Sequence, residues 1–153
     1  MRSQKGVYAV EFAIVAGIFM LLLFAIIEIG RLMFTYNVLH EASRRAARIA
    51  VVCRVDDVDI PNMSLFDGAN LIPNLSSANL VISYLTKEGT EPLTPLDIEI
   101  VRAEISNYQH HFLVPGLYRI INSPTFTTNL PRESLGEYHV EDEDPGSGYI
   151  DCN

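Results

Sequence analysis

The chain has 153 residues, of which 11 are Lys or Arg and 19 are Asp or Glu, so its formal net charge is -8 at pH 7. An acidic chain offers no basic surface to nucleic acid, and we expect no nucleic-acid partner. The length leaves room for one modest domain once a membrane helix is subtracted.

The N-terminal segment joins a short basic leader to a long apolar run. Residues 1–6 read MRSQKG, and from Val7 to Ile27 the only charged residue is Glu11. About 21 residues at roughly 1.5 Å each span about 31 Å, which is enough to cross the core of a bilayer. Because Arg2 and Lys5 precede the run, the positive-inside rule places the N-terminus in the cytoplasm and the acidic remainder outside.

Glu11 is costly where it stands. A carboxylate at mid-membrane costs about 2.5–3.5 kcal/mol on insertion scales, and less near the interface. A charge of this cost indicates a function and requires a partner. We infer that the partner is the amino group created when the chain is cut between Gly6 and Val7.

The cleavage-site pattern supports this inference. Gly6, followed by VYAVEF and an apolar stretch, resembles the processing site of bacterial type IV prepilins. The resemblance implies that a membrane prepilin peptidase cuts after Gly6 on the cytoplasmic side. Val7 then becomes the mature N-terminus, and Glu11, at the fifth mature position, sets assembly register by facing the N-terminus of a neighbouring subunit.

The continuation from Phe12 to Cys53 resembles the TadE-like pseudopilins of the tight-adherence (Tad, Flp) pilus systems, notably in IEIGR at 27–31 and ASRRAAR at 42–48. The resemblance implies a minor pilin that is incorporated into, or primes, a type IV pilus for surface adhesion and biofilm formation. It implies a single-pass protein of the bacterial inner membrane with a periplasmic head, which later becomes extracellular in the pilus. The implied partners are the prepilin peptidase, other pilin and pseudopilin subunits, the inner-membrane assembly platform and the lipid bilayer.

Other functions remain open at this point. An unprocessed bitopic protein that keeps Met1 could serve a secretion or pilus machine as a periplasmic scaffold or binding protein. A cleavable secretory signal is disfavoured, because no Ala-x-Ala-like site follows the apolar run. A periplasmic hydrolase would need a pocket of converging polar groups that the sequence does not indicate.

The helix is expected to continue beyond the membrane. No proline precedes Pro61, and a stripe of mostly apolar residues recurs at steps of three and four, which predicts an amphipathic continuation. The stripe comprises Leu32, Tyr36, Leu39, Ser43, Ala46, Ala50 and Cys53. The pattern predicts one helix over 7–53, transmembrane to about residue 30, with a head on its distal half.

Glu28 and Arg31 stand at the outer edge of the apolar run, three residues apart, and can pair on one helix face. One interpretation is an ordinary interfacial pair that reaches water. The other is a contact with a neighbouring stalk that sets subunit register. The arginines at 44, 45 and 48 are expected to form the solvated face of the helix.

The head, residues 54–153, is expected to be an extracytoplasmic α+β unit with a small antiparallel sheet of three or four strands, as in pilins. The clearest strand lies within 98–107, where Val101, Ala103 and Ile105 alternate with polar residues. Residues 80–86 and 125–128 predict further strands, whereas 108–122 is compatible with a strand or a helical turn. The acidic run 137–144 predicts a solvated, partly disordered tail.

No catalytic or metal-binding motif stands out. The chain lacks HExxH, CxxC, GxSxG and a phosphate-binding loop. His110 and His111 are adjacent and would point to opposite faces of a strand. The acids at 56, 57 and 59 lack the glycine and terminal glutamate of an EF-hand loop. We therefore expect no enzyme activity, no cofactor and no dedicated metal site, although calcium could bind the acidic tail.

Cys53 and Cys152 are the two cysteines, so one intramolecular pairing exists. In an oxidising periplasm a bridge between them would tie the acidic tail to the helix. In the cytosol the same residues would be free thiols. We expect the disulfide.

Overall fold

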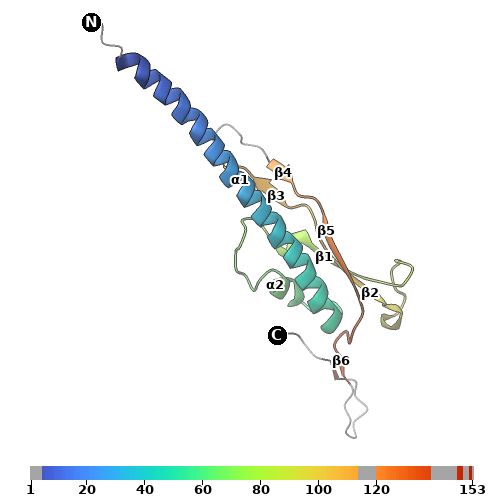
Figure 1. Cartoon of the computed structure of the whole chain (residues 1–153). Helices are drawn as coiled ribbons and strands as arrows, with labels where there is room; N and C mark the ends of the chain where they lie inside the picture. Colours follow the sequence, from blue (N-terminus) through green and yellow to red (C-terminus); the bar gives the residue numbers. More distant parts are fainter. Residues whose placement is uncertain (1–4, 114–119, 139–147, 150–151, 153) are drawn as a thin grey trace.

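The computed structural model describes residues 5–113, 120–138, 148–149 and 152. A single helix, α1 (Lys5–Val52), runs the length of the molecule, and its N-terminal half projects far beyond the head (Figure 1). The other elements lie beside or below its C-terminal half. They are α2 (Ile60–Ser64), η1 (Ser77–Asn79), β1 (Leu80–Leu85), η2 (Pro95–Asp97), β2 (Ile100–Ile105), β3 (Gln109–His111), β4 (Ile120–Asn122), β5 (Phe126–Pro131), β6 (Glu137–Tyr138) and β7 (Gly148–Tyr149).

The main sheet has three antiparallel strands in the order β1-β2-β5, which confirms the expected α+β class. In the register, Ala103 of β2 stands opposite Ile82 of β1 and Thr128 of β5. The alternation predicted for β2 is confirmed, because Val101, Ala103 and Ile105 are all fully buried. These three side chains form the sheet face that packs against α1.

The core follows α1 in three consecutive clusters. Large side chains fill both ends, with Leu39 and Tyr108 in one cluster and Ile60 and Val101 in the other. Between them the core is made of alanines alone, at positions 46, 47 and 103, with partly buried leucines at its edges. Small residues allow helix and sheet to approach closely at this point, since close-packed interiors leave few voids.

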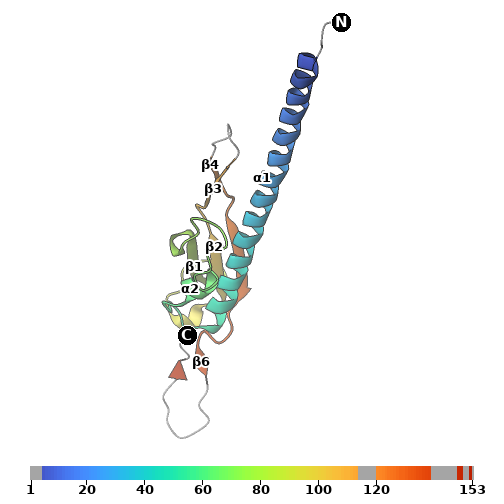
Figure 2. The ribbon, with the colours of Figure 1, turned by 90° about the vertical axis from the view of Figure 1, so that its left-hand side faces the viewer.

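The predicted helix stripe is confirmed in its distal part. Its residues at 39, 43, 46, 50 and 53 are buried, whereas Leu32 and Tyr36 are only half-buried. The buried surface is also wider than predicted and takes in Val38, Ala42 and Val51, because the sheet and α2 both pack against α1 (Figure 2). Ser43, the one polar residue of the stripe, has a hydrogen-bond partner in the sheet, because its Oγ lies 3.0 Å from the Oγ1 of Thr128.

A second, two-stranded sheet extends the head towards the N-terminal half of α1. The chain turns at Asn107 (φ 57°), and β3 then pairs antiparallel with β4. Figures 1 and 2 show this hairpin alongside α1, on the side of the head from which the free half of the helix emerges. His110 is buried and His111 exposed, as expected for neighbours on a strand.

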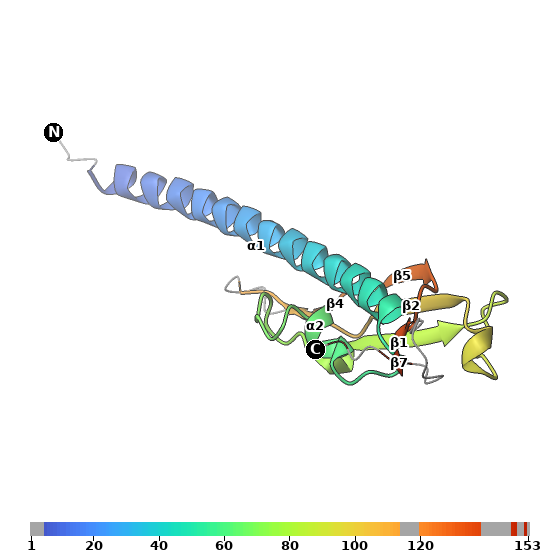
Figure 3. The same ribbon diagram turned by 90° about the horizontal axis from the view of Figure 1, so that it is seen from below.

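The C-terminal end is tied to the distal end of α1. Cys53 and Cys152 form the expected disulfide, with their Cα atoms 5.7 Å apart. Asp57 supports this connection: its Oδ2 accepts a hydrogen bond from the backbone N–H of Cys152 (3.1 Å), and its Oδ1 accepts one from Asp59 (3.0 Å). Residues 139–144, most of the acidic run predicted as a tail, lie outside the described residues. In the view from below, the head elements lie far from the start of α1 (Figure 3).

Candidate functional site

The N-terminal half of α1 is an apolar surface that the described part of the head does not cover. Its large side chains are mostly half or more exposed from Val7 to Phe34, reaching 73% at Phe12 and 71% at Ile26. An apolar surface of this size is rare on a soluble monomer and marks contact with a membrane or with other proteins.

Glu11 lies within this surface and is itself exposed. Among the described residues, no hydrogen bond or ion pair reaches its carboxylate. Gly6 and Val7 precede it by about one helical turn, and both are exposed within α1. The residues expected at the processing and register sites are therefore accessible and adjacent to one another.

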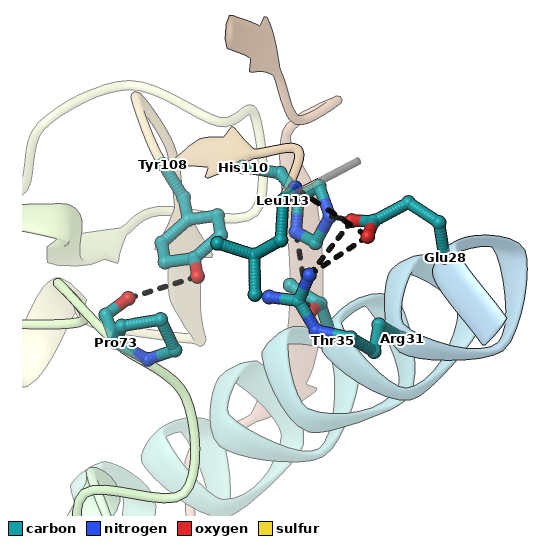
Figure 4. A network of polar contacts seen from close by, with 7 residues as sticks. All are labelled: Glu28, Arg31, Thr35, Pro73, Tyr108, His110 and Leu113. Carbon is teal, nitrogen blue, oxygen red and sulfur yellow. Dashed lines mark hydrogen bonds and ion pairs between the residues drawn. The ribbon is translucent and has the colours of Figure 1, made fainter. Parts of the chain in front are cut away.

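Glu28 is in a different setting, because the head covers it. Its side chain is buried (5% exposed), and the Nη1 of Arg31 donates hydrogen bonds to both of its carboxylate oxygens, at 2.8 and 3.0 Å. Two further donors come from the hairpin: the backbone N–H of Leu113 (3.4 Å to Oε2) and the Nε2 of His110 (3.4 Å to Oε1). Figure 4 shows these groups converging on the carboxylate from α1, from β3 and from Leu113 just after β3.

His110 is held from both ring nitrogens. Its Nδ1 lies 3.5 Å from the Oγ1 of Thr35, one turn beyond Arg31 on α1, and the edge of its ring meets Phe112 with centroids 5.3 Å apart. Both His110 and Thr35 are buried. We call Glu28, Arg31, Thr35, His110 and the Leu113 amide the latch, because they connect the hairpin to the helix.

The buried side chain of Tyr108, just before β3, also supports the latch. Tyr108 is 1% exposed, and its hydroxyl donates a hydrogen bond to the backbone carbonyl of Pro73 at 2.9 Å. Burial of the ring raises the pKa of the Tyr108 hydroxyl above its ordinary value, and the nearby charge of Arg31 partly opposes that rise. The base of the hairpin is thus fixed to the loop before β1 as well as to α1.

The expected pairing of Glu28 with Arg31 is present. The interpretation in which this pair reaches water does not hold for Glu28, which the head buries, and a contact with a neighbouring stalk stays a prediction. The partners His110 and Leu113 lie 82 and 85 residues from Glu28 in sequence. They belong to the segment whose secondary structure the pattern left open. The sequence offers only a His–His pair followed by Phe112 in this segment, and these residues do not predict a contact with Glu28.

The arginine cluster behaves as a solvated helix face. Arg44 and Arg48 are exposed. Arg45 pairs with Asp67 at 3.3 Å and lies over the ring of Phe66, 5.5 Å from its centroid. The exposed ion pair contributes little to stability.

The described residues offer no metal centre: none of their His, Cys, Asp and Glu side chains gather in a group of three or more that could hold an ion.

One helix of the described chain, over Gly6–Val52, is long and apolar enough to cross a membrane by length and composition. Only 6% of its most apolar window is buried, unlike the core helix of a soluble protein. The chain thus has the build of a membrane-anchored single-pass protein.

Residues 6–48 match the family model described as TadE-like protein. No curated protein and no solved structure matches the chain. The matched segment covers the exposed half of α1, Glu11 and the helical part of the latch. This similarity suggests involvement in the Tad pilus system. The N-terminal segment, residues 6–48, is therefore similar to TadE-like proteins.

Proposed function

We propose that the chain is a minor pilin or pseudopilin that is cut between Gly6 and Val7 and then enters or primes a Tad/Flp-type IV pilus for surface adhesion. In this proposal residues 1–6 are a cytoplasmic leader, 7–53 the stalk and 54–153 the extracytoplasmic head. The observation that carries it is Glu11, the one charge between Val7 and Ile27, exposed on an uncovered helix.

Electrostatics explains why such a charge would be kept. Cutting before Val7 creates an ammonium group within the same apolar surface as Glu11. In a low-dielectric environment a carboxylate loses its desolvation penalty only when an opposite charge pairs with it closely. A subunit docked one step out of register would leave Glu11 unpaired. The pair between Glu11 and the Val7 ammonium of a neighbour would therefore select one register of assembly.

The head supports a minor role. Its described part packs against one side of the distal half of α1 and leaves the large apolar side chains before Glu28 exposed, available for packing against other helices or lipid. Major Flp pilins are very short and lack a head of this size. We therefore place the chain at the priming or capping stage of the pilus rather than in its bulk.

Processing can be tested on the natively expressed protein. Mass spectrometry and N-terminal sequencing of membrane extracts should find a chain that starts at Val7, and Gly6→Ala should accumulate as the full-length precursor. A mature wild-type chain that still starts at Met1 would contradict the proposal and would support the alternative, an unprocessed bitopic scaffold or binding protein of the assembly machine.

Assembly can be tested separately. Glu11→Ala should be inserted and cut as in the wild type but should lower the number of pili per cell, because the register pair is missing. Glu41→Ala is the matched control, since Glu41 is an exposed acid on the same helix but lies within the head region. Wild-type pilus numbers in Glu11→Ala cells would refute the register role and leave processing untouched.

A further inference from the structure

We propose that the free edge of β1 accepts an extended strand of another protein, and that this strand carries a Lys or Arg residue next to Asp56. The added strand continues the β1-β2-β5 sheet through main-chain hydrogen bonds and places alternate side chains in a cavity beside β1. This inference goes beyond the proposed function, because it depends neither on cleavage after Gly6 nor on the pairing of Glu11.

β1 is the strand of the main sheet that lies farthest from α1 (Figure 2). The helix packs mainly against β2 and β5, so the inner face of β1 extends beyond it. One edge of β1 pairs with β2 along all six of its residues. The other edge is the boundary of the sheet.

The hydrogen-bond pattern shows which backbone groups of β1 face this boundary. The N–H of Ser106 donates to the carbonyl of Asn79, and these two residues continue the β1–β2 register. In an antiparallel pair every second residue bonds across to the partner strand, so residues 81, 83 and 85 bond β2. Ile82 and Tyr84 therefore direct their N–H and C=O groups to the boundary, where no backbone group of the described chain bonds them.

The free edge of β1 has none of the features that usually keep edge strands from pairing. Its sequence is LVISYL, without a proline, a glycine or a charge, and its register with β2 is uninterrupted by a bulge. The opposite boundary strand, β5, ends in Pro131. Natural proteins blunt their edges with charges, prolines or bulges, whereas an unprotected edge is a template for a further strand.

A cavity of about 280 Å³ lies beside this edge. Leu80, Ile82 and Tyr84 line it from β1, on one face of the strand, and residues 56–61 contribute the other lining side chains. The Tyr84 hydroxyl is buried, and although the backbone of Asp56 lies near it, no hydrogen bond of good geometry reaches it from the described residues. An occupant that offers a polar partner would satisfy this hydroxyl.

Charge favours a different protein over a second copy of this chain as the donor of the strand. Asp56 and Asp57 line the cavity, and none of the described residues that line it is basic. Two copies paired through β1 would bring their acidic cavities to one interface, where like charges repel. A strand with a basic residue meets an opposite charge instead. Asp56 is exposed and lies near Tyr84, so we place this residue opposite Tyr84.

A short peptide tests the proposal on the full chain in detergent micelles. The probe is acetyl-Arg-Thr-Val-Thr-Val-Thr-amide with a neutral fluorophore, and fluorescence anisotropy gives its Kd. In an antiparallel arrangement its arginine faces Tyr84 and its first valine faces Ile82. Binding should slow the amide exchange of Ile82 and Tyr84 to the rate of Ser83, which β2 already protects.

Two methylated peptides show whether the main chain is recognised. Methyl groups on both valine nitrogens block the N–H groups that face β1, so this peptide should not bind. Methyl groups on the nitrogens of the first two threonines block N–H groups that face away from β1, so this matched peptide should keep its affinity. The pair needs no change in the protein and is therefore independent of whether a variant folds.

Asp56→Asn tests the charge. Asn readily adopts the left-handed backbone of this residue (φ 61°), so the loop keeps its conformation. The variant should weaken binding about two- to fivefold, as expected for an exposed ion pair. Glu91→Gln is the matched control, because it removes an exposed charge from the connection between β1 and β2, and it should leave the Kd unchanged.

Absence of peptide binding, equal binding of the two methylated peptides, or unchanged exchange at Ile82 and Tyr84 would overturn the proposal. Protection of both amides that grows with protein concentration without peptide would also overturn it, since a second copy would then occupy the edge. Wild-type affinity in Asp56→Asn would overturn the assignment of a basic partner. N-terminal sequencing measures cleavage separately, so none of these outcomes bears on the proposed pilus role.

Discussion

The Oε1 of Glu28 and the Nε2 of His110 lie 3.4 Å apart, although 82 residues separate them in sequence. This contact connects the outer end of the apolar run on α1 to β3 of the head. It acts at the opposite end of the head from the Cys53–Cys152 bridge. The head is therefore fastened to α1 at both ends, and it cannot pivot about the helix without breaking buried polar contacts.

Coupling between these two residues can be measured by a double-mutant cycle of Glu28→Gln and His110→Phe. Glu28→Gln removes the charge from several hydrogen bonds, and each bond to a charged group contributes about 1.5–3 kcal/mol. We expect it to lower the free energy of unfolding of the head by that order. Residues in direct contact couple by about 0.5–3 kcal/mol, so the double variant should lose less than the sum of the singles.

Denaturant unfolding of the full chain in detergent, followed by near-ultraviolet circular dichroism, gives these free energies. Glu41→Gln is the control, because Glu41 is exposed on the same helix. Strict additivity of the two latch variants would mean that His110 and Glu28 do not interact in solution.

The latch also illustrates how far sequence reasoning reaches. The alternation of Val101, Ala103 and Ile105 predicts the inner face of β2 correctly because six paired residues suffice for a period of two to appear. The helix stripe likewise predicts the distal contacts of α1. In both cases the signal is local and repeats several times.

The hairpin lacks such a signal. β3 and β4 have three residues each, and Asn107 turns the chain just before them. Over three residues a strand cannot be told from a helical turn by periodicity. The burial of Glu28 depends on this hairpin, so it could not be predicted from the residues around Glu28, which resemble any interfacial pair.

Gly136 is required by both backbone conformation and space. Its φ is +81°, and a Cβ at this position would lie 2.8 Å from the backbone N of Arg54. Gly89 has the same conformation (φ +80°) but open space around it. We expect Gly89→Ala to cost about 1–2 kcal/mol of unfolding free energy for the left-handed conformation alone. Gly136→Ala should cost about 1–3 kcal/mol more, because the overpacked backbone must shift.

The two glycine variants are compared in the same unfolding experiment. Equal losses of stability would show that the segment around Gly136 moves away from Arg54 without cost. A larger loss in Gly89→Ala than in Gly136→Ala would contradict the packing of this segment against the end of α1.

The disulfide joins residues 99 apart, so it closes a long loop of the unfolded chain. For a loop of about 100 residues the chain-entropy model gives about 4.7 kcal/mol of stabilisation, and measured values are more often about 2–4 kcal/mol. Cys152→Ser is the cleaner variant, because Cys53 is buried in the core and Cys152 is only partly buried. It should lower the free energy of unfolding by an amount in this range.

Dithiothreitol supplies the matched control for Cys152→Ser. The reductant should bring the wild-type chain down to the stability of the variant and leave the variant itself unchanged. A wild-type chain whose unfolding does not respond to the reductant, although its thiols become reactive, would contradict a stabilising role of the bridge.

Because the Tyr108 hydroxyl is buried, we expect the free energy of unfolding to fall at alkaline pH. Burial raises the pKa of its hydroxyl, and Arg31 opposes the rise in part. The native chain therefore keeps this proton to higher pH than the unfolded chain, whose tyrosine titrates near 10. Below about pH 10 both states are protonated and the contribution is complete. As the pH rises from there through the native pKa, the unfolded state loses the proton first and the free energy of unfolding falls.

Tyr108→Phe separates this effect from the general action of alkali. At pH 8 the variant should lose about 0.5–1.5 kcal/mol, because the hydrogen bond to the Pro73 carbonyl is missing. Above pH 10 its stability should fall less steeply than that of the wild type. Tyr84, whose pKa is also raised mainly by burial, remains in both chains. Tyrosinate absorbance follows the titration, and no tryptophan disturbs it. If the free energy of unfolding fell equally steeply with pH above 10 in the wild type and in Tyr108→Phe, a buried Tyr108 hydroxyl would be contradicted.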